Sequence, residues 1–452
     1  MNLGSNRLTA VACLLGSLVW CSDSEAQARP LPDTNMPSIY QRLLAQIEAI
    51  PIVDMHAHPG YWDDSDVDAM AVSTTGLDPL RTRLSNPEWV AAAKALFEYP
   101  FSDFAPEHVR WLHQKDEELR QQWGKEYFSK ILDRLGIQVS AANRVSLDYL
   151  ANNPRFRFVF FVDPFMFPFN NQNLGINPDR VVYFPIQEKV LHRYLEQAGL
   201  SQLPTDLRGY EAFMRRVLDQ DRQQGAVALK FEAPYFRSLV NITDPPREQA
   251  EAIYNRYQSG GIPSADEYRV FQDYVFRYLI AQAGPLHLQV HIHSAVGSGN
   301  YYHLAEGTAM NLENILRDPR YKDTIFVLIH GGFPFERQAI WLAALPNVYL
   351  DSSEFGILVY PSEYSRTLKQ WFELFPEKVV FGSDAFPYSR EVAVPATYWL
   401  AVQTARTGAA AALAEMVSEG EVTESRAVDI ARDYFHDTTA RLFGIEPLAA
   451  KP

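Results

Sequence analysis

Short apolar runs alternate along the chain with longer segments in which apolar residues recur every three or four positions. The short runs are typical of strands buried on both faces, and the longer segments of helices with one apolar face. The runs span residues 52–56, 137–142, 156–162, 226–231, 286–293, 325–330, 348–352 and 379–383. The helical pattern is clearest over residues 265–282, 336–344, 362–375 and 422–443. Eight such strands alternating with helices favour an α/β fold, a closed (β/α)₈ barrel of the TIM type, over an open sheet.

The spacing of the runs is uneven, because about 80 residues separate the first from the second. Residues 88–135 within this interval read as helical, with the charged run Lys115–Glu118 mostly on a polar face. We therefore predict a mostly helical insertion over residues 60–135, after the first strand and above the barrel mouth. The barrel with this insertion accounts for residues 29–452, a length that one large barrel can reach.

The N-terminus has the pattern of a transport signal. Arg7 precedes an apolar run over residues 8–20, and Ala26-Gln27-Ala28 offers small residues at a cleavage site. The run is shorter than the roughly 20 apolar residues that a membrane span needs. We predict a signal peptide over residues 1–28 and a periplasmic or secreted protein; a retained anchor and lipidation at Cys21 are the alternatives.

The cysteine positions and the net charge limit the kinds of partner that the protein is expected to bind. Both cysteines, Cys13 and Cys21, lie in the predicted signal, so the mature chain can form no disulfide. The net charge of −14 disfavours binding to nucleic acid through its phosphates and gives no attraction to anionic lipid. We expect a small-molecule substrate, no nucleic acid, and no membrane partner once the signal is removed. A homo-oligomer is left open.

Two histidines end the first apolar run, at His56 and His58. Side chains two residues apart on a strand share a face, so both imidazoles can point to one place. That place is the C-terminal end of the strand, where barrel enzymes have their active sites. By itself the pair is weak evidence, because neighbouring histidines also occur on ordinary surfaces.

The same layout, a polar residue where an apolar run gives way to a loop, recurs at four later runs. These residues are Lys230, His293, His330 and Asp384. Each has an ordinary explanation alone, since a lone histidine is often a hydrogen-bonded core residue and a strand-end aspartate often caps a helix. Together they indicate a metal centre, because imidazole and carboxylate ligands suit zinc.

With these motifs the chain resembles the amidohydrolase superfamily over residues 52–444. The resemblance is strongest to the branch that contains aminocarboxymuconate semialdehyde decarboxylase and the amidohydrolase-like domain of certain glutamine synthetase fusions. Its landmarks, in chain order, are Asp54-Met55-His56-Ala57-His58, Leu229-Lys230, Ile292-His293, His330-Gly331-Gly332-Phe333-Pro334, Asn347-Val348-Tyr349-Leu350-Asp351 and Gly382-Ser383-Asp384. Their order is specific to the superfamily and much less specific to one reaction.

The resemblance implies that His56, His58 and His293 ligate a divalent metal, usually Zn²⁺. It makes Asp384 a further ligand and the general base toward the water that the metal activates. His330 is implied to be either a ligand of a second metal or a catalytic residue that polarises the substrate. Zinc lowers the pKa of a bound water to about 7, which agrees with these roles.

The role of Lys230 decides whether the site holds one metal or two, and the sequence leaves both possibilities open. In two-metal relatives a lysine at the end of the fourth strand is carbamylated and bridges the metals. The alternative is a charged Lys230 that pairs with Glu232 or binds an anionic substrate. His291 departs from the family pattern; it shares a strand face with His293 but lies deeper, so we interpret it as buried support.

Tyr235 and Arg237 follow the fourth predicted strand. A guanidinium beside a phenol is suited to holding a substrate carboxylate, so both are candidate substrate-binding residues. A surface salt bridge of Arg237 is the alternative.

The leading hypothesis is a metal-dependent hydrolase that cleaves an amide, lactone or related acyl bond of a small molecule with metal-activated water. Non-oxidative decarboxylation of a small carboxylated substrate is the main alternative, because that branch uses nearly the same residues. An alternative of another class is a catalytically inactive extracytoplasmic binding protein. Serine or cysteine nucleophile chemistry is disfavoured, since the mature chain has no cysteine and no Gly-x-Ser-x-Gly elbow.

Overall fold

The computed structural model describes residues 36–61, 79–175, 177–294, 296–297, 301–387 and 392–448. The predicted signal peptide, its cleavage site and both cysteines lie outside these residues. Every candidate site residue lies within them.

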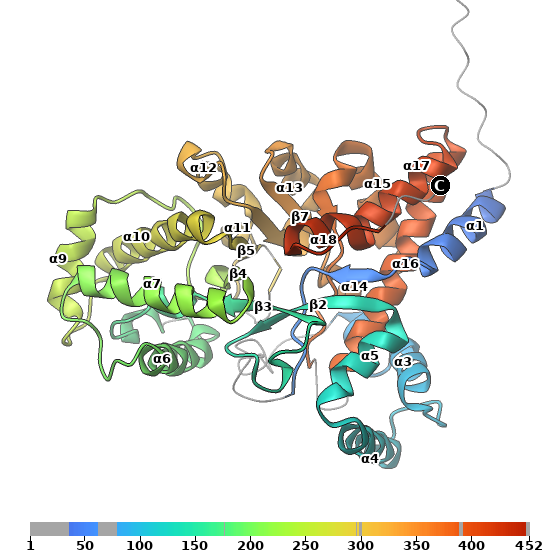
Figure 1. Ribbon diagram of the computed structural model, residues 1–452, viewed down its shortest axis with the longest axis horizontal. Helices are drawn as coiled ribbons and strands as arrows, with labels where there is room; N and C mark the ends of the chain where they lie inside the picture. The colour runs from blue at the N-terminus through green and yellow to red at the C-terminus, as the bar shows by residue number, and fades with distance from the viewer. Residues whose placement is uncertain are drawn as a thin grey trace, which may run out of the picture.

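Eight parallel strands form one sheet in which each strand pairs with the next along the chain (Figure 1). The strands are β1 (Ile52–Asp54), β2 (Ile137–Arg144), β3 (Phe156–Phe161), β4 (Ala226–Phe231), β5 (Gln289–His293), β6 (Phe326–Ile329), β7 (Val348–Asp351) and β8 (Val379–Val380). The sheet closes beyond the last pair, because Met55 N donates to Phe381 O and Ser383 N donates to His56 O. The predicted (β/α)₈ barrel is therefore confirmed.

The strands form where the sequence is apolar on both faces. All four residues of β6 are buried, as are five of the six in β4, because one face fills the barrel and the other packs under helices. A second set of buried residues, Val53, Val139, Val159 and Val327 among them, fills the barrel interior. The barrel is thus a packed core, and its chemistry is confined to the ends of the strands.

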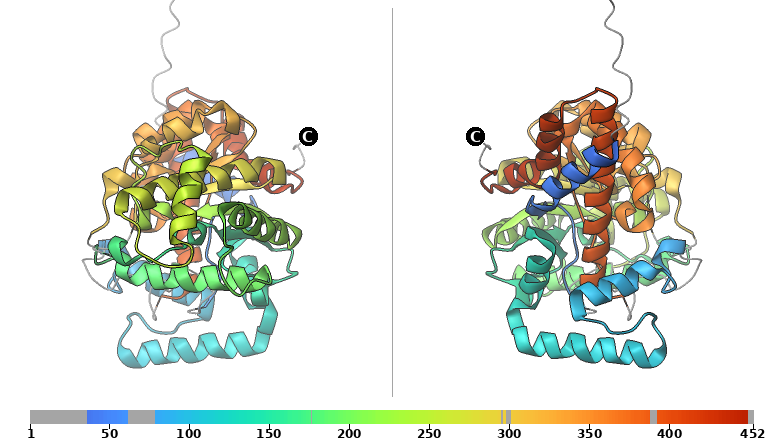
Figure 2. Two further views of the ribbon diagram at one scale, coloured as in Figure 1. Left: turned by 90° about the vertical axis from the view of Figure 1, so that its left-hand side faces the viewer. Right: turned by 90° about the vertical axis from the view of Figure 1, so that its right-hand side faces the viewer.

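Helices surround the sheet (Figures 1 and 2). The longer ones are α1 (Met36–Glu48), α3 (Pro87–Phe97), α4 (Pro106–Trp123), α5 (Tyr127–Leu135), α6 (Arg180–Gln197), α7 (Leu207–Gln223), α9 (Arg247–Tyr257), α10 (Ala265–Ala283), α15 (Pro361–Leu374), α16 (Val394–Ser418), α17 (Glu424–Arg432) and α18 (Thr438–Phe443). Four-residue helices are α8 (Ala233–Phe236), α11 (Leu304–Gly307), α12 (Glu313–Leu316), α13 (Glu336–Ala339) and α14 (Phe355–Leu358). Among the residues that the structure describes, no helix combines the length and apolarity needed to cross a membrane.

Helices α3, α4 and α5 lie between β1 and β2, in the interval where we predict an insertion. Helix α4 projects from one end of the molecule in each view (Figures 1 and 2). Only Leu112 and Leu119 of α4 are buried, which fits its charged sequence. In contrast, α5 buries six of its nine residues against the barrel side.

Some predicted boundaries differ from the structure. Strand β1 ends at Asp54, so His56 and His58 follow the strand instead of lying on it. Strand β5 begins at Gln289, because His287 has a positive φ of 53° that breaks the extended chain. The helical pattern over residues 422–443 is divided into α17, a π-helical turn at Asp433–Asp437 and α18.

Candidate metal centre

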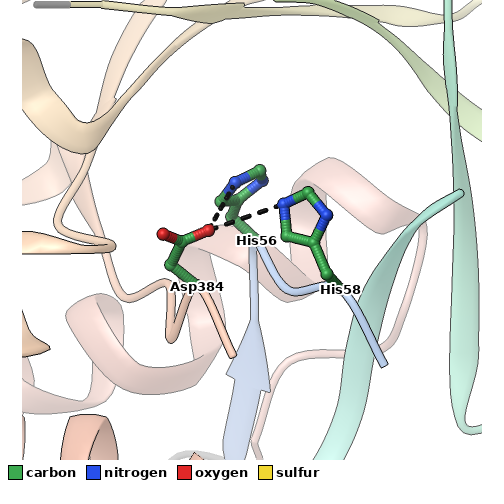
Figure 3. Close-up of side chains that lie close together, drawn as sticks. All are labelled: His56, His58 and Asp384. Carbon is green, nitrogen blue, oxygen red and sulfur yellow. Dashed lines mark ion pairs between the residues drawn. The ribbon is translucent and has the colours of Figure 1, made fainter. Parts of the chain in front are cut away.

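Three side chains converge where β1 and β8 end. Oδ1 of Asp384 lies 3.0 Å from Nε2 of His56 and 3.5 Å from Nε2 of His58 (Figure 3). One ligand atom from each residue falls within 4.8 Å of the others, and all three side chains are buried. Residues more than 320 positions apart in the sequence therefore share one place, as a common cation would require.

Backbone pairing between the two chain segments produces this convergence. The amide groups of Ser383 and Asp384 both donate to His56 O, at 3.1 and 2.7 Å. Buried Asp54 reinforces the junction, because its carboxylate accepts from Ser383 N at 2.8 Å and from Ser383 Oγ at 2.7 Å. Asp54 thus explains why an aspartate precedes the two histidines.

Asn143 of β2 orients the ring of His56, with its Nδ2 2.6 Å from Nδ1 of the ring. Oδ1 of Asn143 has no partner among the described residues. An Asn143 amide turned by 180° about its Cβ–Cγ bond places Oδ1 toward the His56 ring, where it accepts the Nδ1 proton. The lone pair on Nε2 then faces Asp384, which is the orientation that metal-binding histidines need.

His330 extends the cluster, whereas His293, a ligand implied by the resemblance, belongs to neither group of converging ligand atoms among the described residues, and its Nε2 contacts Val296 O. Nε2 of His330 lies 3.0 Å from Nδ1 of His293, and the ring centroids of His56 and His330 are 5.3 Å apart. His330 also forms, with Glu354 and Asp384, a second group whose ligand atoms lie within 4.8 Å of one another. Asp384 belongs to both groups and can join them.

Glu354 is a site candidate that our sequence reasoning missed. It follows β7, and its Oε2 lies 3.6 Å from Nδ1 of His330. The sequence did contain a pattern that points to Glu354. The polar residues Asp351 to Glu354 end and follow the apolar run of β7, which is the layout seen at the other strands. His330, Glu354 and Asp384 all have positive φ, of 64°, 59° and 50°. Such backbones cost of the order of 1 kcal/mol or more each and are concentrated at functional sites.

Lys230 is fully buried on β4, and its Nζ lies 2.5 Å from Oε1 of Glu232. Burial alone would raise the pKa of Glu232, but Lys230 and His293 together lower it below its usual value. This contact corresponds to the alternative in which a charged Lys230 pairs with Glu232. Carbamylation of Lys230 stays a prediction.

His291 and the two predicted substrate-binding residues have distinct surroundings. His291 is buried, and its Nε2 lies 3.1 Å from Oε1 of Gln289, deeper in the barrel. The ring of Tyr235 lies 4.6 Å from that of His293. Arg237 is buried and forms an ion pair with Asp273 of α10, a structural role that our prediction gave as the alternative, although the pair lies beneath the surface.

The electrostatics of the site favour neutral imidazoles. Burial, with Lys230 second, lowers the pKa of His56 well below 6.5. Burial and the neighbouring His293 do the same to His330, and burial lowers the pKa of His293 to about 4. Neutral imidazoles keep the lone pairs that bind a cation. His56 and His58 beside the buried carboxylate of Asp384 are a donor set that fits a divalent metal such as zinc.

Solved structures with this fold support the architecture. An uronate isomerase from Thermotoga maritima is 16% identical with a TM-score of 0.59, over 90% of this chain and 97% of its own. A protein from Lactobacillus casei described as a metal-dependent hydrolase is 16% identical with a TM-score of 0.58, over 89% of this chain and 97% of its own. At this identity the likeness concerns the fold alone.

Sequence comparison identifies relatives in addition. Protein fluG of Emericella nidulans is 27% identical over 154 residues, which are 34% of this chain and 17% of that protein. This chain thus matches less than a fifth of the length of its curated relative. The sequence model of the family described as Amidohydrolase matches residues 201–445, which contain Lys230, His293, His330 and Asp384. The chain therefore belongs to the amidohydrolase family, within a superfamily of metal-dependent enzymes.

Proposed function

We propose that this protein is a metal-dependent hydrolase that cleaves an amide, lactone or related acyl bond of a small molecule. The observation that carries the proposal is the buried convergence of His56, His58 and Asp384 at the C-terminal end of the barrel. Zn²⁺ is the metal we propose, with His293, His330, Glu354 and Lys230 as the further residues available to one or two ions. When bound, the cation supplies a Lewis acid that makes water nucleophilic near neutral pH.

The residues of the chain then have separate roles. Asp384 accepts the proton of the attacking water at its carboxylate and returns it to the leaving group. His330 donates a hydrogen bond toward the substrate carbonyl when it does not bind a second ion. Tyr235, beside His293, gives the substrate an aromatic wall. Arg237 acts by holding the structure around this wall through Asp273.

The roles are tested by metal content and turnover measured together. Asp384→Asn keeps the size of the side chain, so most metal should remain while turnover of an N-acyl amino acid and lactone panel falls by about 10³-fold or more, as when a general base is lost. His56→Ala should lose metal, as measured by plasma mass spectrometry. His436→Ala is the control, because His436 is equally buried but contacts Asp437 and Gln138 away from the cluster.

Equal metal loss in His56→Ala and His436→Ala would refute the assignment of the ligands. A fully metal-loaded protein that releases CO₂ from carboxylated substrates, and hydrolyses none of the panel, would favour the decarboxylase. A protein that retains no metal after expression in supplemented medium would favour the inactive binding protein.

Export is a second part of the proposal, supported by Arg7 and the apolar run that follows it. Cell fractionation and N-terminal sequencing of the mature protein test it. The expected mature chain begins near Arg29; an intact N-terminus in the cytoplasm would refute export.

A further inference from the structure

A pocket lies beside the histidine cluster, and we call it the Arg180 pocket. Its lining includes Arg180, Tyr183, Tyr235, Tyr302 and Glu306. Tyr235 connects the pocket to the candidate metal centre. The centroid of its ring lies 4.6 Å from that of His293 on one side and 5.2 Å from that of Tyr183, on which it stacks, on the other. The pocket has room for a small polar group only, so a substrate that reacts at the cluster can place one end in it while its body lies across Tyr235.

The pocket presents two polar groups that the fold does not use. Among the described residues, the guanidinium of Arg180 makes no hydrogen bond and no ion pair, although Glu306 and Asp179 are near enough to act on its charge. The hydroxyl of Tyr302 is buried and has no hydrogen-bond partner among the described residues. Burial raises the pKa of Tyr302 well above 10, so this phenol stays protonated. Both groups are donors, and such a pair suits a ligand that offers acceptors.

Two glycines leave the space that the Tyr302 ring occupies. A Cβ at Gly307 would lie 2.5 Å from the Tyr302 hydroxyl, and a Cβ at Gly297 would lie 2.6 Å from Cε2 of the ring. Both distances are shorter than any stable contact, so the phenol fills a slot that only glycine leaves open.

Two acidic residues, Asp179 and Glu306, line the same pocket, and each contacts a neighbouring lining residue. Oδ2 of Asp179 accepts from Tyr301 N at 2.7 Å. Glu306 stands at the rim with a side chain that is 42% exposed, and Oε1 lies 3.8 Å from Nδ1 of His303. Glu306 can compete with an anion for Arg180, but water screens it because of its exposure.

We propose that the Arg180 pocket binds a carboxylate group of the substrate, with the body of the substrate lying against Tyr235, which the buried ring of Tyr183 supports from the other side. A guanidinium donates two parallel hydrogen bonds to a carboxylate, and the Tyr302 hydroxyl supplies a third donor. The aromatic ring of Tyr235 favours a planar or cyclic body. This inference rests on the proposed function, since it assigns the class of substrate to that site: a ring-bearing carboxylic acid whose amide or ester bond lies near the histidines.

The probe for a test is benzoate, with benzamide as its neutral counterpart, titrated calorimetrically into the protein as isolated with its metal. We expect benzoate to bind at least tenfold more tightly than benzamide. Arg180→Met should weaken benzoate binding tenfold or more and leave benzamide binding unchanged, while Arg180→Lys, which keeps only the charge, should give an intermediate loss. Tyr302→Phe removes only the hydroxyl and should weaken benzoate binding severalfold. Glu306→Gln should strengthen it.

Arg317→Met is the matched control, because Arg317 is an exposed arginine paired with Glu313 on α12 and should leave both affinities unchanged. A carboxylate that bound to the metal would be insensitive to Arg180→Met, and that result would overturn the proposal. Equal affinities for benzoate and benzamide, or no binding of benzoate, would also overturn it. The titration needs no turnover, so its outcome is independent of whether the Asp384→Asn test supports hydrolysis.

Discussion

Asp221, on α7 and remote from the strand ends that form the site, offers a prediction about stability. Its side chain is 3% exposed, Oδ1 accepts from Gln197 Nε2 at 2.8 Å, and Oδ2 has no partner among the described residues. Burial raises the pKa of this carboxyl from 3.8 to about 7. The folded protein therefore holds a proton here that the unfolded chain has already released. We predict that Asp221→Asn stabilises the protein at and above neutral pH.

The sign follows from the two pKa values. Between pH 3.8 and about 7 the folded state binds more protons than the unfolded state, so stability falls as the pH rises through this window. The difference of roughly three pKa units, at 1.36 kcal/mol for each, sets an upper limit of about 4 kcal/mol above pH 7. From pH 5 to pH 8 the variant should gain about 2 to 3 kcal/mol relative to the unchanged protein.

Urea unfolding of both proteins at pH 5, 6, 7 and 8 measures this gap. Metal binding also depends on pH, but it affects both proteins equally and cancels in the difference. Asp219→Asn is the control, because Asp219 lies on the same helix with a 41% exposed side chain paired to Arg215. A gap for Asp221→Asn that stays constant from pH 5 to pH 8 would refute the assignment of a neutral buried carboxyl.

Three further predictions concern the site. Gly382→Ala would place a Cβ 1.9 Å from Oδ2 of Asp351, so we expect a loss of about 1 to 3 kcal/mol in urea unfolding and a lower turnover. Asn143→Leu removes the amide that orients His56, and metal affinity should fall by about 10- to 100-fold in a competition titration with a chromophoric chelator. Complete removal of metal should lower the melting temperature in calorimetry, and added Zn²⁺ should restore it, because a ligand that binds only the folded state stabilises it; an unchanged melting temperature would contradict a metal held within the core.

The sequence was sufficient to predict the barrel because strands with two buried faces are continuously apolar. The residues that end β4, β5, β6 and β8 could be identified for the same reason, since a polar side chain there interrupts an apolar run. The end of β1 could not be placed, because the backbone pairing that holds His56 to β8 depends on Ser383 and Asp384, over 320 residues away.

Side-chain contacts at the strand ends and in the loops after them could not be predicted from the sequence, because they depend on tertiary packing. Lys230 can face a metal or pair with Glu232, depending on the rotamers of these two side chains at the end of β4. The sequence pattern is the same in both cases. Glu354 offers a carboxylate in the same layout as the other candidates and could have been noticed, whereas the amide of Asn143 does not by itself suggest a metal centre. Their importance depends on the direction in which the loops after β2 and β7 turn, and tertiary packing determines that direction.

The left-handed backbones at His330, Glu354 and Asp384 have a consequence for attempts to improve this protein. Glycine adopts such a backbone without steric strain, so a glycine at any of the three positions would relieve that strain while it removed a proposed ligand. Heat-based selection without an activity screen would therefore enrich inactive variants at these three positions. Substitutions that raise thermal stability are better sought in the outer helices, where stability and turnover do not compete.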